Sequence, residues 1–146
     1  MDEHDLPIDS DVEARAAATV SRDVVVAVSV GGALGALARW WVAELLPHDP
    51  GRFPWATFLT NIVGCFLIGV LMVLVVERWP GRRLVRPFLG TGVLGGFTTF
   101  STYAVDTRTL LAADRPAVAA AYVVLSLAVG LLAVLAGLRL AGRSLR

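Results

Sequence analysis

The sequence predicts an all-α integral membrane protein with four transmembrane helices. Of its 146 residues, 56% are hydrophobic and only 17% are charged, a composition far from that of soluble domains. The apolar residues also gather in four long runs, and a helix needs roughly 20 predominantly apolar residues to cross about 30 Å of hydrocarbon. Together these observations exclude a soluble catalytic domain.

Proline marks the start of three of the four runs. The runs cover residues 24–46, 54–76, 87–111 and 117–138. Pro54, Pro87 and Pro116 stand where the second, third and fourth runs begin, a position in which the missing N–H and the fixed φ of proline are tolerated. The first, second and fourth runs are regular apolar segments, whereas polar residues interrupt the third.

The third run contains the unusual stretch GVLGGFTTFSTY at residues 92–103. It holds three glycines and five hydroxyl residues and no charge. We expect the helix to break at Gly95-Gly96, because glycine lets the backbone unwind. Lipid satisfies no backbone polar group, so a broken segment persists at membrane depth only where protein or a polar cavity surrounds it. The third run is therefore predicted to be central.

Two tails flank the predicted membrane domain, residues 24–140. Residues 1–23 hold seven of the twelve acids, a composition typical of disorder, and residues 141–146 form a short basic tail. A secretory signal begins with a basic region, so the acidic tail is interpreted as retained. The single cysteine, Cys65, excludes an internal disulfide and argues against a thiolate metal site.

Arg39 lies well inside the first run, four residues after the GxxxG pair Gly31 and Gly35. Small residues at this spacing let helices approach closely. A guanidinium at membrane depth is costly unless it is paired, reaches the surface or faces water. Snorkelling with packing and a vestibule that attracts anions explain Arg39 equally well.

Polar pairs also occupy one helical face in the second and fourth runs. Thr57 and Asn61 are four residues apart, as are Tyr122 and Ser126, a spacing that places side chains on the same face. Such residues can hold helices together. An amide or hydroxyl can also donate hydrogen bonds to an anion without carrying a fixed charge. Both interpretations remain open.

The third run adds further donors and aromatic rings. Its hydroxyls are Thr98, Thr99, Ser101 and Thr102, and Phe100 and Tyr103 are interleaved among them. The positive edge of an aromatic ring can meet an anion, although the spacing alone favours packing for these rings. The runs thus offer an uncharged path rich in donors.

Several reactive residue types are missing from the runs. The chain has no lysine, its two histidines lie outside the runs, and no acid lies in the middle of a run, since Glu44, Glu77 and Asp106 are at or near run ends. A proton-coupled carrier needs a titratable relay in the bundle, and an enzyme needs an acid–base or metal constellation. Neither class is expected, and no nucleic-acid partner is expected.

Three segments carry a resemblance to a known family. They are GGALGALAR at residues 31–39, TFLTNIVGCFLIG at 57–69 and, above all, GTGVLGGFTTFSTY at 90–103. Together they resemble the Fluc/CrcB family of fluoride channels, over nearly all of residues 24–140. The resemblance implies passive export of fluoride across the cell membrane. The alternatives are a small four-span dimeric multidrug exporter and a membrane scaffold protein.

The resemblance also implies an antiparallel dimer with two fluoride pathways and a structural sodium ion at its centre. By position, the sodium ligands are the backbone carbonyls of Gly95 and Thr98 from each subunit. The pore residues implied or weighed above are Arg39, Thr57, Asn61, Phe100, Ser101, Thr102, Tyr103, Tyr122 and Ser126. Two positions depart from the family pattern, because Tyr103 stands where phenylalanine is usual and Gly130 where a hydroxyl is usual.

Arginine counts predict the orientation of the chain in the bilayer. With four spans, both termini and the connection at residues 77–86 share one side, which holds nine arginines against three on the other. The positive-inside rule places that side, and so both termini, in the cytoplasm. An antiparallel partner would then be an oppositely oriented paralogue, with an identical chain as the alternative.

Overall fold

The structure, a computed structural model, describes residues 21–144, and all of its regular elements are helical. The helices are α2 (Arg22–Leu45), α3 (Trp55–Glu77), η1 (Arg86–Leu94), α4 (Gly95–Phe97), α5 (Phe100–Ala112) and α6 (Pro116–Ser144). The prediction of an all-helical chain is confirmed for these residues. Residues 1–20 and 145–146, which include most of the predicted acidic tail and the last two residues of the predicted basic tail, lie outside the described residues; residues 141–144 of the basic tail belong to α6. Arg22 and Asp23, expected in the acidic tail, belong to α2.

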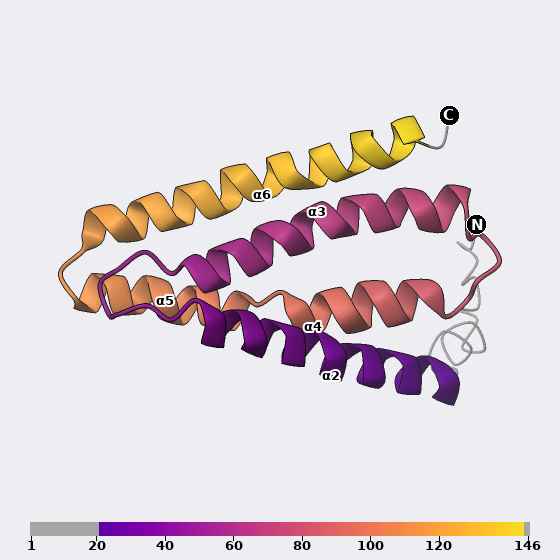
Figure 1. Cartoon of the computed structure of the whole chain (residues 1–146), viewed down its shortest axis with the longest axis horizontal. Coiled ribbons are helices and arrows are strands. Elements are labelled where there is room, and N and C mark those ends of the chain that lie inside the picture. Colours follow the sequence, from indigo (N-terminus) through magenta and orange to yellow (C-terminus); the bar gives the residue numbers. More distant parts are fainter. Residues whose placement is uncertain (1–20, 145–146) are drawn as a thin grey trace, which may run out of the picture.

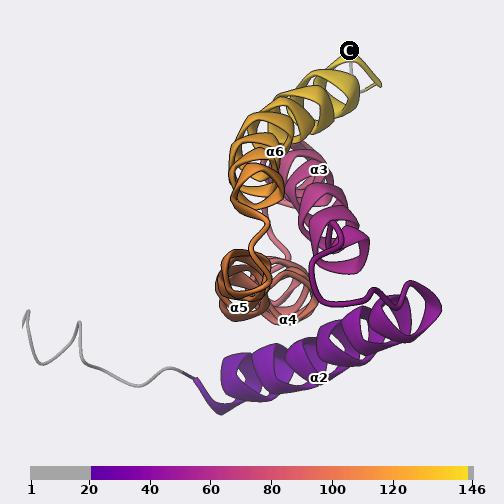
Figure 2. The ribbon, with the colours of Figure 1, turned by 90° about the vertical axis from the view of Figure 1, so that its left-hand side faces the viewer.

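The helices run side by side between two ends of the molecule. α3 packs mainly against α6, and α2 packs against η1 and α4, with α5 lying between α2 and the start of α6 (Figures 1 and 2). The start of α2, the connection from α3 to η1 and the end of α6 share one end (Figure 1). The connections from α2 to α3 and from α5 to α6 share the other.

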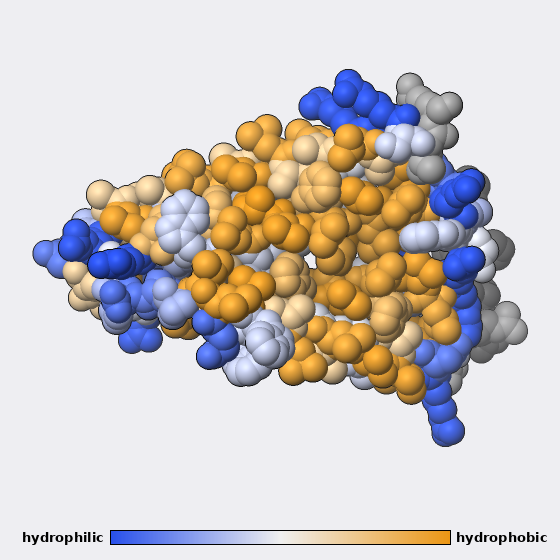
Figure 3. All heavy atoms as spheres, viewed as in Figure 1, coloured by the Kyte–Doolittle hydropathy of each residue, from blue (hydrophilic) through white to orange (hydrophobic). Residues whose placement is uncertain are grey.

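Three of the helices, α2, α3 and α6, are long and apolar enough to cross a membrane. Figure 3 shows hydrophobic residues over the middle of the molecule and hydrophilic residues at both ends. Large apolar side chains such as Leu131 and Leu132, 68% and 64% exposed, face outward. In a membrane protein these faces meet lipid or another subunit, so the surface agrees with a multi-pass membrane protein.

The third apolar run forms three consecutive helices, η1, α4 and α5, instead of one. Its first part is a π-helix, in which the Gly95 N–H donates to the carbonyl of Gly90, five residues back. The prediction of a break at Gly95-Gly96 is wrong. Gly95 is helical, with φ −65° and ψ −35°, and the chain becomes extended at Thr98 and Thr99.

The glycines of this region serve close packing instead of unwinding. A Cβ on Gly96 would lie 2.3 Å from the Gly32 carbonyl oxygen of α2, and a Cβ on Gly35 would lie 2.1 Å from the Val93 carbonyl oxygen of η1. Gly137 of α6 likewise sits against α3, where a Cβ would lie 2.2 Å from the Phe66 carbonyl oxygen. Glycine therefore lets backbone meet backbone at both helix contacts.

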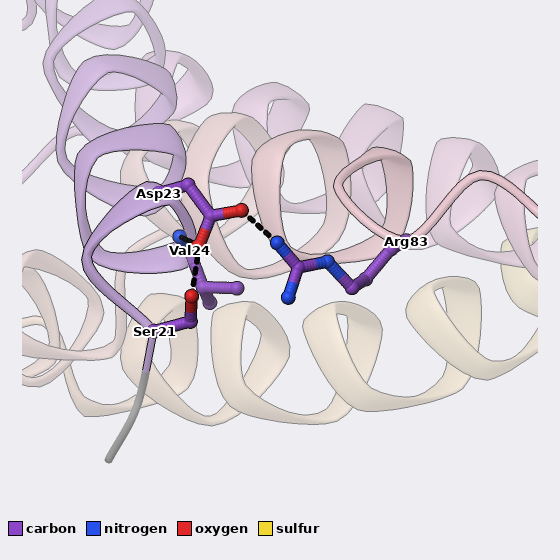
Figure 4. Close-up of polar contacts among 4 residues, drawn as sticks. All are labelled: Ser21, Asp23, Val24 and Arg83. Carbon is purple, nitrogen blue, oxygen red and sulfur yellow. Dashed lines mark hydrogen bonds and ion pairs between the residues drawn. The ribbon is translucent and has the colours of Figure 1, made fainter.

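Polar contacts fix the first turn of α2 (Figure 4). The Asp23 carboxylate accepts hydrogen bonds from the Ser21 hydroxyl and from the Val24 N–H, the latter at 3.0 Å. It also pairs with Arg83 in the connection between α3 and η1. An acidic side chain in the first turn suits the positive end of the helix dipole, and the ion pair holds this turn against the neighbouring connection.

We expect Gly35→Ala to destabilise the protein by about 3 kcal/mol, because the new methyl group would overlap the η1 backbone. The matched control is Gly32→Ala in the same helix, where a Cβ has no atom outside its own helix turn within 4 Å among the described residues. Unfolding in detergent would measure both variants. Equal stability of the two would contradict the packing role of Gly35.

Candidate functional site

The site forms around the break in the third segment. Thr98 has φ −81° and ψ 158°, and Thr99 has φ −150° and ψ 127°, both extended conformations. Asn61 of α3 bridges the break from the side: its Nδ2 donates to the Thr99 carbonyl oxygen at 3.0 Å, and its Oδ1 accepts from the Thr99 N–H at 2.9 Å. One amide thus satisfies both backbone groups of the extended residue.

Thr99 also begins α5 as its N-cap. Its Oγ1 accepts a hydrogen bond from the Thr102 N–H at 3.1 Å, which satisfies one of the N–H groups that a helix start leaves open. The same oxygen lies 3.2 Å from the Ser101 hydroxyl and 3.1 Å from the Thr102 hydroxyl. Three of the hydroxyls predicted to line a path therefore form one cluster at the start of α5, whereas the Thr98 hydroxyl donates to the Leu94 carbonyl oxygen.

The break releases two carbonyl oxygens of the preceding turn. In a continuous helix the Gly95 carbonyl would accept from the Thr99 N–H, and the Thr98 carbonyl from the Thr102 N–H. Here those N–H groups are donated to Asn61 and to the Thr99 hydroxyl. Carbonyl oxygens are ligands that hard cations prefer, so the two residues expected to hold sodium fit that role by their chemistry.

Arg39 contacts the same turn from α2. Its Nε donates to the Gly96 carbonyl oxygen at 3.1 Å, which satisfies another backbone acceptor near the break. The two glycine contacts described above bring α2 close enough for this reach. Arg39 therefore has a structural partner in the turn next to the break.

Two cavities flank the break and divide the predicted site residues between them. The α6-side cavity, about 470 Å³, is lined by residues that include Asn61, Thr98, Thr99, Phe100, Tyr103 and Ser126. The α2-side cavity, about 370 Å³, is lined by residues that include Arg39, Thr57, Thr60, Thr99 and Thr102. Thr99 lines both cavities. Ser101 and Tyr122, also predicted for the site, line neither.

An aromatic row runs from the α6-side cavity into the protein core. Phe100 is 80% exposed, and its ring centroid lies 5.8 Å from that of Tyr103. The Tyr103 ring centroid lies 5.1 Å from that of Tyr122, and the Tyr122 ring packs edge-on against Phe53 with a centroid distance of 5.4 Å. Tyr103 therefore packs between the exposed ring of Phe100 and the fully buried ring of Tyr122.

Two hydroxyls of α6 are buried without a hydrogen-bond partner among the residues that the structure describes. They are the Tyr122 hydroxyl and the Ser126 Oγ. A buried hydroxyl without a partner costs about 1–3 kcal/mol. Polar groups in this situation need an ordered water or a ligand as partner. Tyr122 and Ser126 lie one helical turn apart in α6, and the polar track expected from the sequence stays a prediction.

Asp106 is a site residue that the sequence analysis missed. Its Oδ2 accepts a hydrogen bond from the Thr57 hydroxyl at 2.6 Å, and Thr57 is only 6% exposed. Thr57 and Asn61 thus lie on one face of α3, yet Thr57 bonds to a side chain of α5 and Asn61 bonds to the backbone at the break. The available signal was a carboxylate within an apolar run, which needs a partner at that depth.

Fold and site define a small helical membrane protein whose broken central segment carries neutral donors and aromatic rings. Residues 26–138 match the family model described as CrcB-like protein, Camphor Resistance (CrcB). This chain belongs to that family. The resemblance stated from its sequence motifs is therefore confirmed.

Named relatives agree with the family. The chain is 56% identical over 104 residues to Fluoride-specific ion channel FluC 2 of Streptomyces avermitilis, covering 71% of this chain and 66% of the relative. It is 48% identical over 117 residues to FluC 3 of the same organism, covering 80% and 57%. It is 47% identical over 115 residues to FluC 2 of Thermobifida fusca, covering 79% and 85%. The chain thus matches less than two thirds of the length of the two Streptomyces relatives.

We expect Asn61→Leu to destabilise the protein by about 1–3 kcal/mol, since it leaves both backbone groups of Thr99 without their partner. Thr109→Val is the control, because its hydroxyl donates to the Val105 carbonyl one turn earlier in the same helix, on an exposed face. Unfolding in detergent compares the two variants. A loss no larger for Asn61→Leu than for the control would show that the break does not depend on the amide.

Proposed function

We propose that this chain forms a fluoride-specific ion channel in the cell membrane, through which fluoride leaves the cell down its own gradient. One observation carries the proposal beyond family membership. A break held by Asn61 is flanked by two cavities whose walls offer amide, hydroxyl and aromatic-edge donors. The printed names of the relatives, fluoride-specific ion channels, identify the anion that we propose for this chain.

The chemistry of the walls suits an anion that must lose its water. A pore for a strongly hydrated ion must replace the hydration shell with ligands at close range. Asn61 keeps one Nδ2 hydrogen beyond the one given to Thr99, Ser126 offers an unpartnered hydroxyl among the described residues, and the Phe100 ring offers a positive edge. These donors carry no full charge, so the anion can leave again.

The proposed channel is an antiparallel dimer. Phe100 is 80% exposed although it lines the α6-side cavity, so a second subunit is needed to enclose the path at this ring. Two different FluC chains named from one organism support a paralogue as the partner. An identical chain in the opposite orientation is the alternative.

A sodium ion at the dimer centre is part of the same proposal. The Gly95 and Thr98 carbonyls of each subunit would hold it, since the break releases both oxygens from helical hydrogen bonding. Its contribution would be to neutralise carbonyl dipoles that meet at the interface. It would stabilise the assembly, and fluoride flux would not follow a sodium gradient.

Fluoride efflux from liposomes tests the function. Vesicles that contain the purified chain, alone and mixed with its candidate paralogue, are loaded with fluoride and assayed with no proton gradient. Rapid efflux of fluoride without chloride supports the channel. Efflux that requires a proton gradient would favour an exporter, and the absence of flux from every assembled sample would favour a scaffold.

We expect Phe100→Ile to lower fluoride flux roughly tenfold or more with the assembly intact, because it keeps apolar bulk and removes the ring edge. Leu127→Ile is the matched control, since Leu127 lines the same cavity without a ring. Liposome flux and size-exclusion chromatography measure both variants. Equal flux would reduce Phe100 to a packing residue.

We also expect both termini to lie in the cytoplasm. Among the described residues, the end where α2 begins and α6 ends carries seven arginines and the opposite end three. The positive-inside rule places the side with more arginines in the cytoplasm. Reporters that are active in only one compartment, fused to either terminus, measure the orientation. Equal signals from both compartments would instead favour a homodimer of two orientations.

A further inference from the structure

The two ends of the described chain differ in charge. The end where α2 begins and α6 ends (Figure 1), here called the arginine end, carries the exposed residues Arg22, Arg78, Arg82, Arg83, Arg86, Arg139 and Arg143. Its acids are Asp23 and Glu77, so seven positive against two negative residues leave five positive charges. The opposite end has three arginines and four acids, Glu44, Asp49, Asp106 and Asp114. Only the arginine end is strongly basic.

An acidic segment joins the chain at this same end. Residues 1–20 lie outside the described residues and lead into α2 through Ser21. They contain six acids and one arginine, which leaves five negative charges. The segment therefore matches the arginine end in magnitude and opposes it in sign, and it is attached next to it.

The first acid after this segment already binds the arginine end. Asp23 pairs with Arg83 of the connection between α3 and η1 (Figure 4). Both side chains are partly exposed, at 40% and 66%, so the pair lies at the surface where further carboxylates can approach. The contact also places the start of α2 directly beside the arginine-rich connection.

The acids of residues 1–20 can reach the neighbouring arginines. A chain of ten residues spans at most about 33–36 Å, and two packed helices lie about 8–10 Å apart. Acids such as Asp9, Asp11 and Glu13 thus lie within reach of a connection that packs beside α2. Guanidinium groups bind carboxylates with two parallel hydrogen bonds, so several such pairs could form at once.

We propose that the acidic segment, residues 1–20, binds the arginine end of its own chain through its carboxylates. The segment covers arginines that would otherwise meet anionic lipid headgroups. Individual exposed ion pairs are weak and are screened by salt, so the contact depends on the whole set of charges. This contact does not depend on what the membrane domain conducts.

Cysteine cross-linking tests the contact in the full chain. Asp9→Cys is combined with Arg82→Cys in a Cys65→Ala background, in nanodiscs of phosphatidylcholine. The control pair combines Asp9→Cys with Asp114→Cys at the opposite end. Gel mobility and peptide mass spectrometry separate links within one chain from links between chains.

We expect the Asp9–Arg82 pair to link within one chain roughly fivefold more at low salt than at about 1 M, where the Debye length falls to about 3 Å. The control pair should link within one chain only at background level. Changing the five remaining acids of the segment to amides should lower the Asp9–Arg82 link to the same background.

Two results would overturn the proposal. One is an Asp9–Arg82 link that persists in the amide variant or ignores salt, because proximity alone would then explain it. The other is loss of the link when phosphatidylglycerol is added to the nanodiscs, because lipid headgroups would then occupy the arginines. A link that survives the anionic lipid supports the segment as the occupant.

Discussion

The double hydrogen bond between Asn61 and the backbone of Thr99 is the interaction on which the rest of the site depends. Hydrocarbon offers no partner to an open N–H or carbonyl, so the chain can be extended at Thr99 only where the protein supplies both partners. One amide does this from α3. It thereby sets where α5 starts and hence how Phe100 and Tyr103 are presented to the α6-side cavity.

Close backbone packing supplies the second constraint. Because Gly35 and Gly96 have no Cβ, α2 lies directly on η1 and α4. Arg39 follows Gly35 by one helical turn, and this approach brings its guanidinium to the Gly96 carbonyl. These residues therefore all act near one turn of backbone. Arg39 satisfies the Gly96 carbonyl, Asn61 satisfies both backbone groups of Thr99, and the glycines let α2 come close to this turn.

Much of the fold could be predicted from the sequence, because run length and proline position depend on local residues. The four apolar runs correspond to α2, α3, α6 and the broken segment. The site of the break could not be located in this way. Glycine was expected to unwind the helix at Gly95-Gly96, but Gly95 is helical and the missing Cβ of Gly96 serves contact with α2. The extended residue is fixed by Asn61, which lies 38 positions earlier.

The candidate site was predictable in its residue types more than in its geometry. Helical spacing correctly placed Thr57 and Asn61 on one face of α3, yet spacing says nothing about partners on other helices. Thr57 meets Asp106 and Asn61 meets Thr99, contacts that arise only when α5 packs beside α3. The division of the polar residues between two cavities has the same origin, since it follows from where the break lies between α2 and α6.

The π-helical geometry of η1 affects how the protein would respond to a one-residue deletion. A π-helix closes hydrogen bonds over five residues, where an α-helix closes them over four, so the stretch Arg86–Leu94 accommodates more residues per turn. Loss of a single codon here could convert a π turn to an α turn without breaking the helix. The tighter turn takes up the missing residue, so the residues downstream keep the faces that they present. In an α-helix each residue instead turns the chain by about 100°, so a one-residue deletion inside α5 would rotate everything after it, whereas one in Arg86–Leu94 would leave the Phe100 ring at its cavity.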